Sequence, residues 1–324
     1  MPESKSAAGQ RAVPPAGVLA DGEQPIVCDY TGQDYSRFWH SPVKSLLHQT
    51  ELRFVRRMLP ANGGWWLEVG SGYGRLLPAY WRADRQIVLV DYALDLLLRA
   101  AQIHPQENLH FLAADAYRLP FRDEVFAAGL SVRIFHHANA PHSFLKEVAR
   151  TLRPDARCLV SYSNKRNLLR ALRVGCSAFR HDHEAYDEGL FGTHPAHFAR
   201  LARQAGLQVR LSRGTGLLDQ LARGNGFLNR LLGSFPWLKP PAALLDRLAD
   251  ASLGRLQWTP LNFSLLHKTS APASPLPAPP ASLADLLACP HCRSTSLRQE
   301  PSQDWSCLEC GKRYAHQGQV FDFR

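Results

Sequence analysis

The residues best suited to chemistry lie in a glycine-rich turn that directly follows an acidic side chain. Glu68 is followed by Gly70, Gly72 and Gly74, and Ser71 lies inside the turn. Glycine is needed where the backbone turns sharply or approaches a ligand closely, because a β-carbon would clash there. A turn of this kind between a strand and a helix N-terminus is typical of nucleotide-cofactor sites in open α/β sheets.

The glycine spacing bears on which nucleotide this turn accepts. Dinucleotide sites carry the pattern G-x-G-x-x-G, whereas Arg75 stands here where the third glycine of that pattern would be. A NAD or FAD site is therefore an imperfect match and stays an alternative at this point.

Two more carboxylates follow apolar runs further along the chain. Asp91 ends the run 86–90, about 20 residues beyond the turn, where an acidic side chain can accept hydrogen bonds from ribose hydroxyls. Asp115 follows the run 109–114, where its carboxylate could accept from an adenine amino group. The full set of expected cofactor-binding residues is Glu68, Gly70, Ser71, Gly72, Gly74, Asp91, Tyr92, Ala114, Asp115, Ala116 and Ser131.

Two adjacent histidines, His136 and His137, are the candidate catalytic residues. Imidazole titrates near neutral pH, so either ring could act as a general base. The alternative is that both rings only border a pocket. Nearby Arg133 could contact the cofactor or an acidic substrate, or be a surface residue.

Four cysteines near the C-terminus have metal-ligand spacing. Cys289 and Cys292 form one C-x-x-C pair, and Cys307 and Cys310 form a second. Four thiolates close a tetrahedral Zn²⁺ site and leave no position for a substrate, so the expected ion is structural. A segment of roughly 40 residues has too little core to fold alone, and metal binding would stabilise it. Two disulfides or a redox pair are the alternatives.

The elements that must position these residues alternate between strand and helix. Apolar runs predict strands at 66–69, 86–90, 109–114, 126–131, 157–163 and 261–266, and helical patterns cover 75–81 and 141–152. This alternation predicts an α/β fold with a parallel sheet.

Taken in order, these pieces resemble a class I S-adenosylmethionine-dependent methyltransferase of the broad ubiquinone/menaquinone-type group ("type 11"). The resemblance covers about residues 30–268 and depends on the sequence blocks 68–74, 91, 114–116, 119–121, 136–137 and 147–154. It implies a seven-stranded Rossmann-like sheet with the last strand antiparallel and helices on both faces. It also implies S-adenosylmethionine as cofactor, with Asp91 at the ribose and Asp115 at the adenine. One departure is Asp155-Ala156, where the family usually has two glycines.

The C-terminal segment resembles a second family. The block 286–292, the pair Cys307 and Cys310 with Gly311, Tyr314, and the ending 320–324 look like the small zinc-ribbon activator subunit of tRNA and protein methyltransferases. The resemblance implies docking of the ribbon on its own methyltransferase domain, and it supports an RNA or translation-factor substrate.

The composition of the 324 residues bears on the partners, the compartment and the domain divisions of the chain. Residues 150–268 hold 18 Lys and Arg against 8 Asp and Glu, which favours an anionic small molecule, RNA or acidic membrane surface, or reflects only a solvated surface. No apolar run approaches a membrane span or a signal peptide, so we expect a cytoplasmic protein. The expected divisions are a disordered tail at 1–25, the methyltransferase domain at 26–268, a Pro/Ala/Ser linker at 269–283 and the zinc ribbon at 284–324.

Two insertions are expected to shape substrate choice. The segment 165–193 reads as a basic amphipathic helix that could line a pocket, touch RNA or lie on a membrane, or pack as a surface helix. Its residues 181–184 read as a polar loop at the pocket mouth rather than a metal site. The pattern of the segment 216–256 predicts apolar helices that either cover an apolar substrate, such as a quinone or lipid, or complete the core.

The function that these expectations favour is methyl transfer from S-adenosylmethionine to an O or C nucleophile of a small or lipid-linked metabolite. No Asn-Pro-Pro-Tyr motif follows the fourth strand, which makes an amine acceptor less suitable. The first alternative is an RNA methyltransferase with a built-in zinc-ribbon activator. The second is an inactive methyltransferase fold that acts as a binding module.

Overall fold

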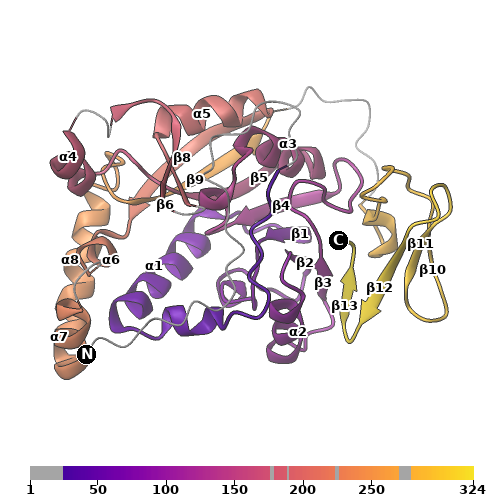
Figure 1. The fold of residues 1–324 in the computed structure, drawn as a ribbon, viewed down its shortest axis with the longest axis horizontal. Coiled ribbons are helices and arrows are strands. Elements are labelled where there is room, and N and C mark those ends of the chain that lie inside the picture. Colours follow the sequence, from indigo (N-terminus) through magenta and orange to yellow (C-terminus); the bar gives the residue numbers. More distant parts are fainter. Residues whose placement is uncertain (1–24, 176–178, 188–189, 223–225, 270–278) are drawn as a thin grey trace, which may run out of the picture.

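Eleven strands form one mixed sheet in the computed structural model, and helices cover both of its faces (Figure 1). The structure describes residues 25–175, 179–187, 190–222, 226–269 and 279–324. The expected tail at 1–25, apart from residue 25, and residues 270–278 of the expected linker lie outside this range. The strands of the sheet are β1 (Gly64–Val69), β2 (Arg85–Asp91), β3 (Leu109–Ala113), β4 (Phe126–Ser131), β5 (Leu152–Ser163), β8 (Leu207–Thr215), β9 (Leu261–Lys268), β10 (Leu297–Gln299), β11 (Trp305–Cys307), β12 (Arg313–Gln317) and β13 (Val320–Asp322).

Seven of these strands reproduce the sheet that the resemblance implies. Their order is β3-β2-β1-β4-β5-β9-β8, and the neighbours from β3 to β5 are parallel. Strand β9 runs antiparallel to both β5 and β8. The expectation of a seven-stranded sheet is nevertheless wrong, because β10 to β13 extend the same sheet beyond β3.

The central strands are apolar on both sides because each face of the sheet is covered. Trp65, Leu67 and Val69 of β1 belong to one buried cluster, and Trp66 of the same strand belongs to the other. The helices that pack on the two faces are α1 (Pro42–Met58) and α2 (Leu94–Ile103) on one, and α3 (Pro141–Thr151) and α5 (Pro195–Gln204) on the other. The sheet is therefore fixed from both sides, as is usual for parallel sheets.

The C-terminal segment joins the fold through strand β13. This strand pairs in parallel with β3, and the Phe323 N–H donates to the Ala113 carbonyl oxygen at 2.7 Å. A second contact lies at residues 286–288, where the Arg122 N–H donates to the Leu286 carbonyl at 2.8 Å and the Ala288 N–H donates to the Pro120 carbonyl at 3.0 Å. Leu286, Leu287, Trp305 and Phe323 lie in the same buried cluster as β1. The C-terminal segment therefore shares its core with the methyltransferase-like sheet.

Two expected helices differ from the structure. In the segment 75–81 only one 3-10 turn forms, at Leu77–Ala79, because Pro78 lacks the N–H that an α-helix would need there.

In the segment 165–193 a short helix, α4 (Leu168–Val174), ends at Gly175 with φ 59°, and a hairpin of β6 (His183–Asp187) and β7 (Leu190–Thr193) follows. Residues 176–178 and 188–189 of this segment lie outside the described residues. His183 is buried in β6, its Nε2–H donates to the Ala138 carbonyl oxygen at 2.7 Å, and it accepts from Thr193 at Nδ1. His183 and Glu184 therefore lie in a strand rather than in the expected polar loop, and His181 and Asp182 directly precede that strand.

The segment 216–256 is helical, as expected. It forms α6 (Leu217–Ala222), α7 (Phe227–Ser234), the 3-10 turn η5 (Pro236–Leu238) and α8 (Lys239–Ala251). These elements pack on α1, at the end of the molecule opposite the C-terminal strands (Figure 1). No helix among the described residues is both long enough and apolar enough to cross a membrane.

Candidate active site

The glycine turn leaves β1 with three left-handed residues. Gly70, Gly72 and Gly74 have φ of 75°, 54° and 76°. A β-carbon on Gly70 would lie 1.9 Å from Cγ1 of Ile134, and one on Gly74 would lie 2.8 Å from Cδ2 of His104. Glycine is therefore required for the turn to pass this close to its neighbours.

Asp91 at the tip of β2 holds the glycine turn in place. Its Oδ2 accepts from the Gly72 N–H at 2.7 Å, and its Oδ1 accepts from the Ala93 N–H at 3.0 Å. Burial raises the pKa of the Asp91 carboxyl, and these two N–H donors partly oppose the rise. The carboxylate thus connects two strand tips at the carboxyl edge of the sheet, where open α/β sheets bind ligands.

Glu68 is the second buried carboxyl of the site. The Tyr80 hydroxyl donates to its Oε2, and the Tyr80 ring stacks on Trp66 with centroids 6.0 Å apart. Burial raises the pKa of the Glu68 carboxyl to about 8, even though the bond from Tyr80 opposes the rise. Glu68 is therefore largely protonated in the folded chain at neutral pH.

A cavity of about 510 Å³ brings most of the predicted residues together. This size lies within the range of small-molecule and cofactor sites. The predicted residues that line it are Glu68, Gly70, Ser71, Gly72, Asp91, His136 and His137. A second cavity of about 70 Å³ shares Gly70, Asp91 and His137 with it and adds the predicted residues Tyr92, Ala114 and Ala116.

Three predicted cofactor-binding residues line neither of these cavities. Gly74 faces His104, and Ser131 is fully buried at the end of β4. Asp115 accepts from the Tyr117 N–H of its own turn at 2.8 Å, and burial raises the pKa of its carboxyl. The contact of Asp115 with an adenine stays a prediction.

The two candidate catalytic histidines lie in a 3-10 turn, Phe135–His137, after β4. Their ring centroids are 4.1 Å apart. The Tyr30 hydroxyl lies 3.0 Å from Nε2 of His137, which places the segment before α1 beside the cavity. Tyr30 and Tyr35, which precede the first strand, both line the cavity.

A cluster of buried charged side chains forms one wall of the cavity, which we call its cationic wall. Glu51 of α1 is fully buried, with Oε1 2.7 Å from Nε of Arg133 and Oε2 2.7 Å from a terminal nitrogen of Arg75. Burial raises the pKa of the Glu51 carboxyl, but the two guanidinium groups more than offset this and hold the pKa below its usual value. Arg75 also stacks over Trp39 at 3.7 Å, and both arginines line the cavity together with Lys44.

Sequence reasoning noted Arg133 but missed Lys44, Glu51 and Arg75. A signal was present, because Lys44, His48 and Glu51 are spaced four and three apart and so share one face of α1. That spacing places cavity-lining side chains on a helix whose other positions are largely apolar or solvent-exposed.

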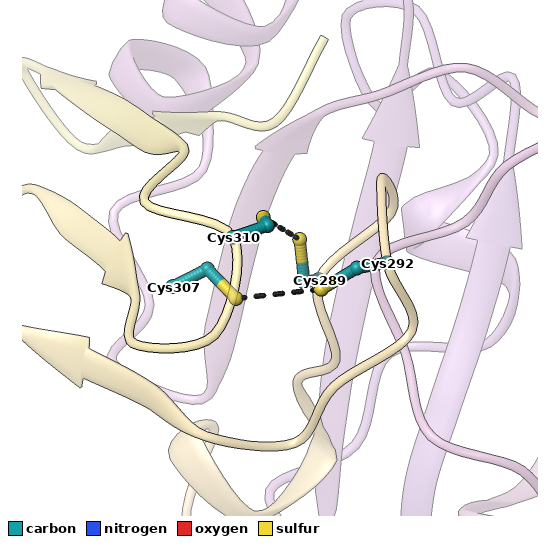
Figure 2. Close-up of side chains that lie close together, drawn as sticks. All are labelled: Cys289, Cys292, Cys307 and Cys310. Atoms are coloured by element: carbon teal, nitrogen blue, oxygen red, sulfur yellow. Dashed lines mark hydrogen bonds between the residues drawn. The ribbon is translucent and has the colours of Figure 1, made fainter.

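The four predicted zinc ligands come together between the ribbon loops (Figure 2). The sulfurs of Cys289 and Cys310 are 3.6 Å apart, those of Cys292 and Cys307 are 3.5 Å apart, and all four lie within 4.8 Å of one another. Zn–S bonds of about 2.3 Å in a tetrahedron require sulfur separations of about 3.8 Å. The cysteines are not bonded to each other, so the set fits a single Zn²⁺ ion.

Comparison with known proteins agrees with this geometry. A family model for the methyltransferase domain matches residues 67–160, which hold the glycine turn, Asp91 and both histidines. A search of curated proteins finds no match.

Two solved structures share the fold. A candidate S-adenosylmethionine-dependent methyltransferase from Listeria monocytogenes is 11% identical, with 70% of this chain and 100% of that chain covered at a TM-score of 0.51. A complex between the Haloferax volcanii Trm112 methyltransferase activator and a candidate methyltransferase gives 18% identity, with 75% of this chain and 99% of that chain covered at a TM-score of 0.50. The chain thus has the α/β fold of class I S-adenosylmethionine-dependent methyltransferases, with a cysteine cluster at its C-terminal end.

Proposed function

We propose that this chain transfers a methyl group from S-adenosylmethionine to an O or C nucleophile of a small or lipid-linked metabolite. The observation that supports this most is that Glu68, the glycine turn, Asp91 and the two histidines line one cavity. S-adenosylmethionine, when bound, would supply an electrophilic methyl group on a sulfonium sulfur.

Each part of the cavity has a proposed task. The turn at Gly70 and Gly72 lets backbone approach the cofactor, and Asp91 accepts from its ribose hydroxyls. His136 or His137 removes the proton from the acceptor, which a general base can do at neutral pH. Positioning by the cavity walls supplies much of the remaining rate.

Charge at the acceptor end favours an anionic group on the acceptor. Lys44, Arg75 and Arg133 line the cavity, and the acidic partners of these cations are Glu51 and Asp219. Three cations along one cavity would suit a carboxylate or phosphate near the methyl acceptor.

The C-terminal ribbon is proposed to bind Zn²⁺ through Cys289, Cys292, Cys307 and Cys310 and to stabilise the cofactor end of the sheet. Arg324 supports this, because its guanidinium donates to the Tyr92 carbonyl at 3.2 Å, next to Asp91. The division into 26–268, a linker at 269–283 and a ribbon at 284–324 is likewise proposed.

A second candidate is methylation of tRNA or another RNA with the ribbon as a built-in activator. The likeness to a complex that contains a methyltransferase activator favours it, as does the pairing of β13 with β3.

One labelling experiment separates the candidates. The purified chain is incubated with S-adenosylmethionine carrying a radioactive methyl group and an extract of cells that lack this gene. Label in the lipid or small-molecule fraction, absent with boiled protein, is the expected result. Label in RNA would replace the first candidate by the second, and bound cofactor without label in any fraction would indicate a binding module.

A further inference from the structure

Helix α8 carries its aspartates inward and three of its leucines outward. Asp246 and Asp250, one turn apart, have relative exposures of only 6% and 8%. Leu244, Leu245 and Leu248 of the same helix are exposed by 57%, 67% and 57%. This is the reverse of a helix that packs its apolar stripe on a core.

Specific partners hold the two aspartates inside. Asp250 pairs with Arg53 of α1 at 3.2 Å, and the Asp246 carboxylate accepts from the Leu218 N–H of α6 at 3.3 Å. These bonds fix the rotation of α8, so its leucines cannot turn inward without leaving buried carboxylates unpaired.

The outward apolar side chains continue beyond α8. Large apolar residues that are at least 47% exposed occur on α6, α7, η5 and the turn after α8: Leu221, Phe227, Phe235, Trp237 and Leu256. These elements pack on one another and on α1 at a single end of the molecule (Figure 1). Such concentrations of exposed apolar side chains mark interaction surfaces. We call this set of elements, residues 216–222 and 226–258, the apolar end.

The charged side chains that the apolar end exposes to solvent are all basic among its described residues. Its described acidic residues are Asp219, Asp246 and Asp250, and all three are buried. Its described basic residues are exposed or half-buried, and they are Arg230, Lys239, Arg247 and Arg255. The apolar end therefore presents leucine, phenylalanine and tryptophan side chains together with cations and no described exposed carboxylate.

We propose that the apolar end docks on an anionic lipid bilayer and rests in its headgroup region. Exposed Trp, Phe and Leu beside Lys and Arg are what an interfacial helix requires, and anionic lipids attract the cations. A second copy of this chain fits poorly, because a two-fold contact would place cations against cations with no exposed acid to pair them. RNA would use the arginines but would leave the outward leucines unexplained.

Docking in this way would bring the bilayer close to the acceptor end of the cavity. Lys44 of α1 lines the cavity, and it pairs with Asp219 of α6 at 2.7 Å. A lipid-borne acceptor would thus meet the cavity at its cationic wall. This last step alone depends on the proposed function; the docking itself does not.

Sedimentation with vesicles tests the docking on the full chain. The protein is mixed with vesicles of phosphatidylcholine alone, or of phosphatidylcholine with phosphatidylglycerol, at low and high salt. Binding is expected only to the anionic vesicles and is expected to weaken as salt rises. The double variant Trp237→Ser/Leu245→Gln is expected to bind at least about tenfold more weakly, because it loses two apolar side chains that would be buried in the headgroup region. Arg247→Gln is expected to weaken binding about fivefold.

Matched controls lie elsewhere on the surface. Ile103→Gln replaces an apolar side chain that is 48% exposed on α2, and Arg298→Gln removes an exposed cation from β10. Both controls should bind like the wild type, and all variants should unfold at the wild-type temperature. Equal binding to both vesicle types, or equal losses in the controls, would overturn the proposal. So would a dimer in sedimentation velocity that Trp237→Ser/Leu245→Gln dissociates, because the apolar end would then be a contact between copies.

Discussion

Two buried carboxyls control the site at the scale of single residues, and they do so in opposite ways. Glu68 is held in an uncharged state by burial, with one hydroxyl donor from Tyr80. Glu51 is held ionised by two guanidinium groups, although it is just as deeply buried. Burial sets the charge of Glu68, where its one donor opposes the shift too weakly, whereas the two guanidinium partners outweigh burial at Glu51.

Glu68 should make stability depend on pH. Its carboxyl has a folded pKa of about 8 against an ordinary value of 4.5, so between these values the folded chain binds more protons than the unfolded chain. The free energy of unfolding should then fall as pH rises through this window. Relative to the wild type, Glu68→Gln should gain on the order of 2 kcal/mol between about pH 5 and pH 8. Urea unfolding at both pH values measures this, and a constant difference between the two proteins would contradict it.

Removing Glu51 should be far more costly than removing an exposed acid. Glu51→Ala leaves Arg75 and Arg133 in a buried site without their carboxylate, which should destabilise the fold by about 3–5 kcal/mol. Asp123→Ala is the control, since the Asp123 side chain is 73% exposed in its pair with Arg150 and should contribute less than about 1 kcal/mol. Similar unfolding midpoints for the two variants would show that Glu51 does not stabilise the fold through Arg75 and Arg133.

At the scale of elements, the strands and the helical segment 216–256 were predictable, and the segment 165–193 was not. Apolar runs that are buried on both faces identify β1, β2 and β4 from the sequence, because no other local structure suits them. In the segment 165–193, helical spacing was misleading. The buried Lys165 binds Asp182 and Glu184 at the start of β6, and this contact between distant residues has no local signature.

Some residues of the candidate site were also predictable from the sequence, and others were not. The glycine turn and Asp91 could be found from spacing alone, because backbone geometry fixes the residue types there. The partnership of Glu51 with Arg133 joins residues 82 apart in the sequence, and only the packing of α1 on the sheet brings them together. Asp115 accepts from the Tyr117 N–H within its own turn, as short acidic side chains often do, and its contact with an adenine stays a prediction.

Strands β10 to β13 should depend on the proposed zinc ion. A chelator should lower the unfolding temperature of the whole chain by about 10 °C in one transition, because the ribbon shares a core with β1. Cys307→Ser should lower it similarly without chelator. Cys28→Ser lies outside the cluster and should respond to the chelator like the wild type. An unchanged unfolding temperature would argue against a metal site, and two separate transitions would argue against a shared core.

At the scale of the whole molecule, two additions flank the methyltransferase-like sheet, and only the ribbon extends it. The ribbon lies on β3, and its last residue contacts the strand tip beside Asp91. The apolar end lies on α1, which contributes Lys44 to the lining of the cavity. Under the proposed function, the ribbon would support the cofactor end of the site and the apolar end would border its acceptor end.

Calorimetric titration with S-adenosylmethionine tests the central claim, which is that the cavity binds this cofactor through the glycine turn and Asp91. The wild type should bind, and Asp91→Asn should bind at least about tenfold more weakly, because it loses a charged acceptor for two hydroxyls. Asp155→Ala, whose side chain is 84% exposed, should bind like the wild type. No heat with the wild type, or saturable binding of NAD in place of S-adenosylmethionine, would contradict the account.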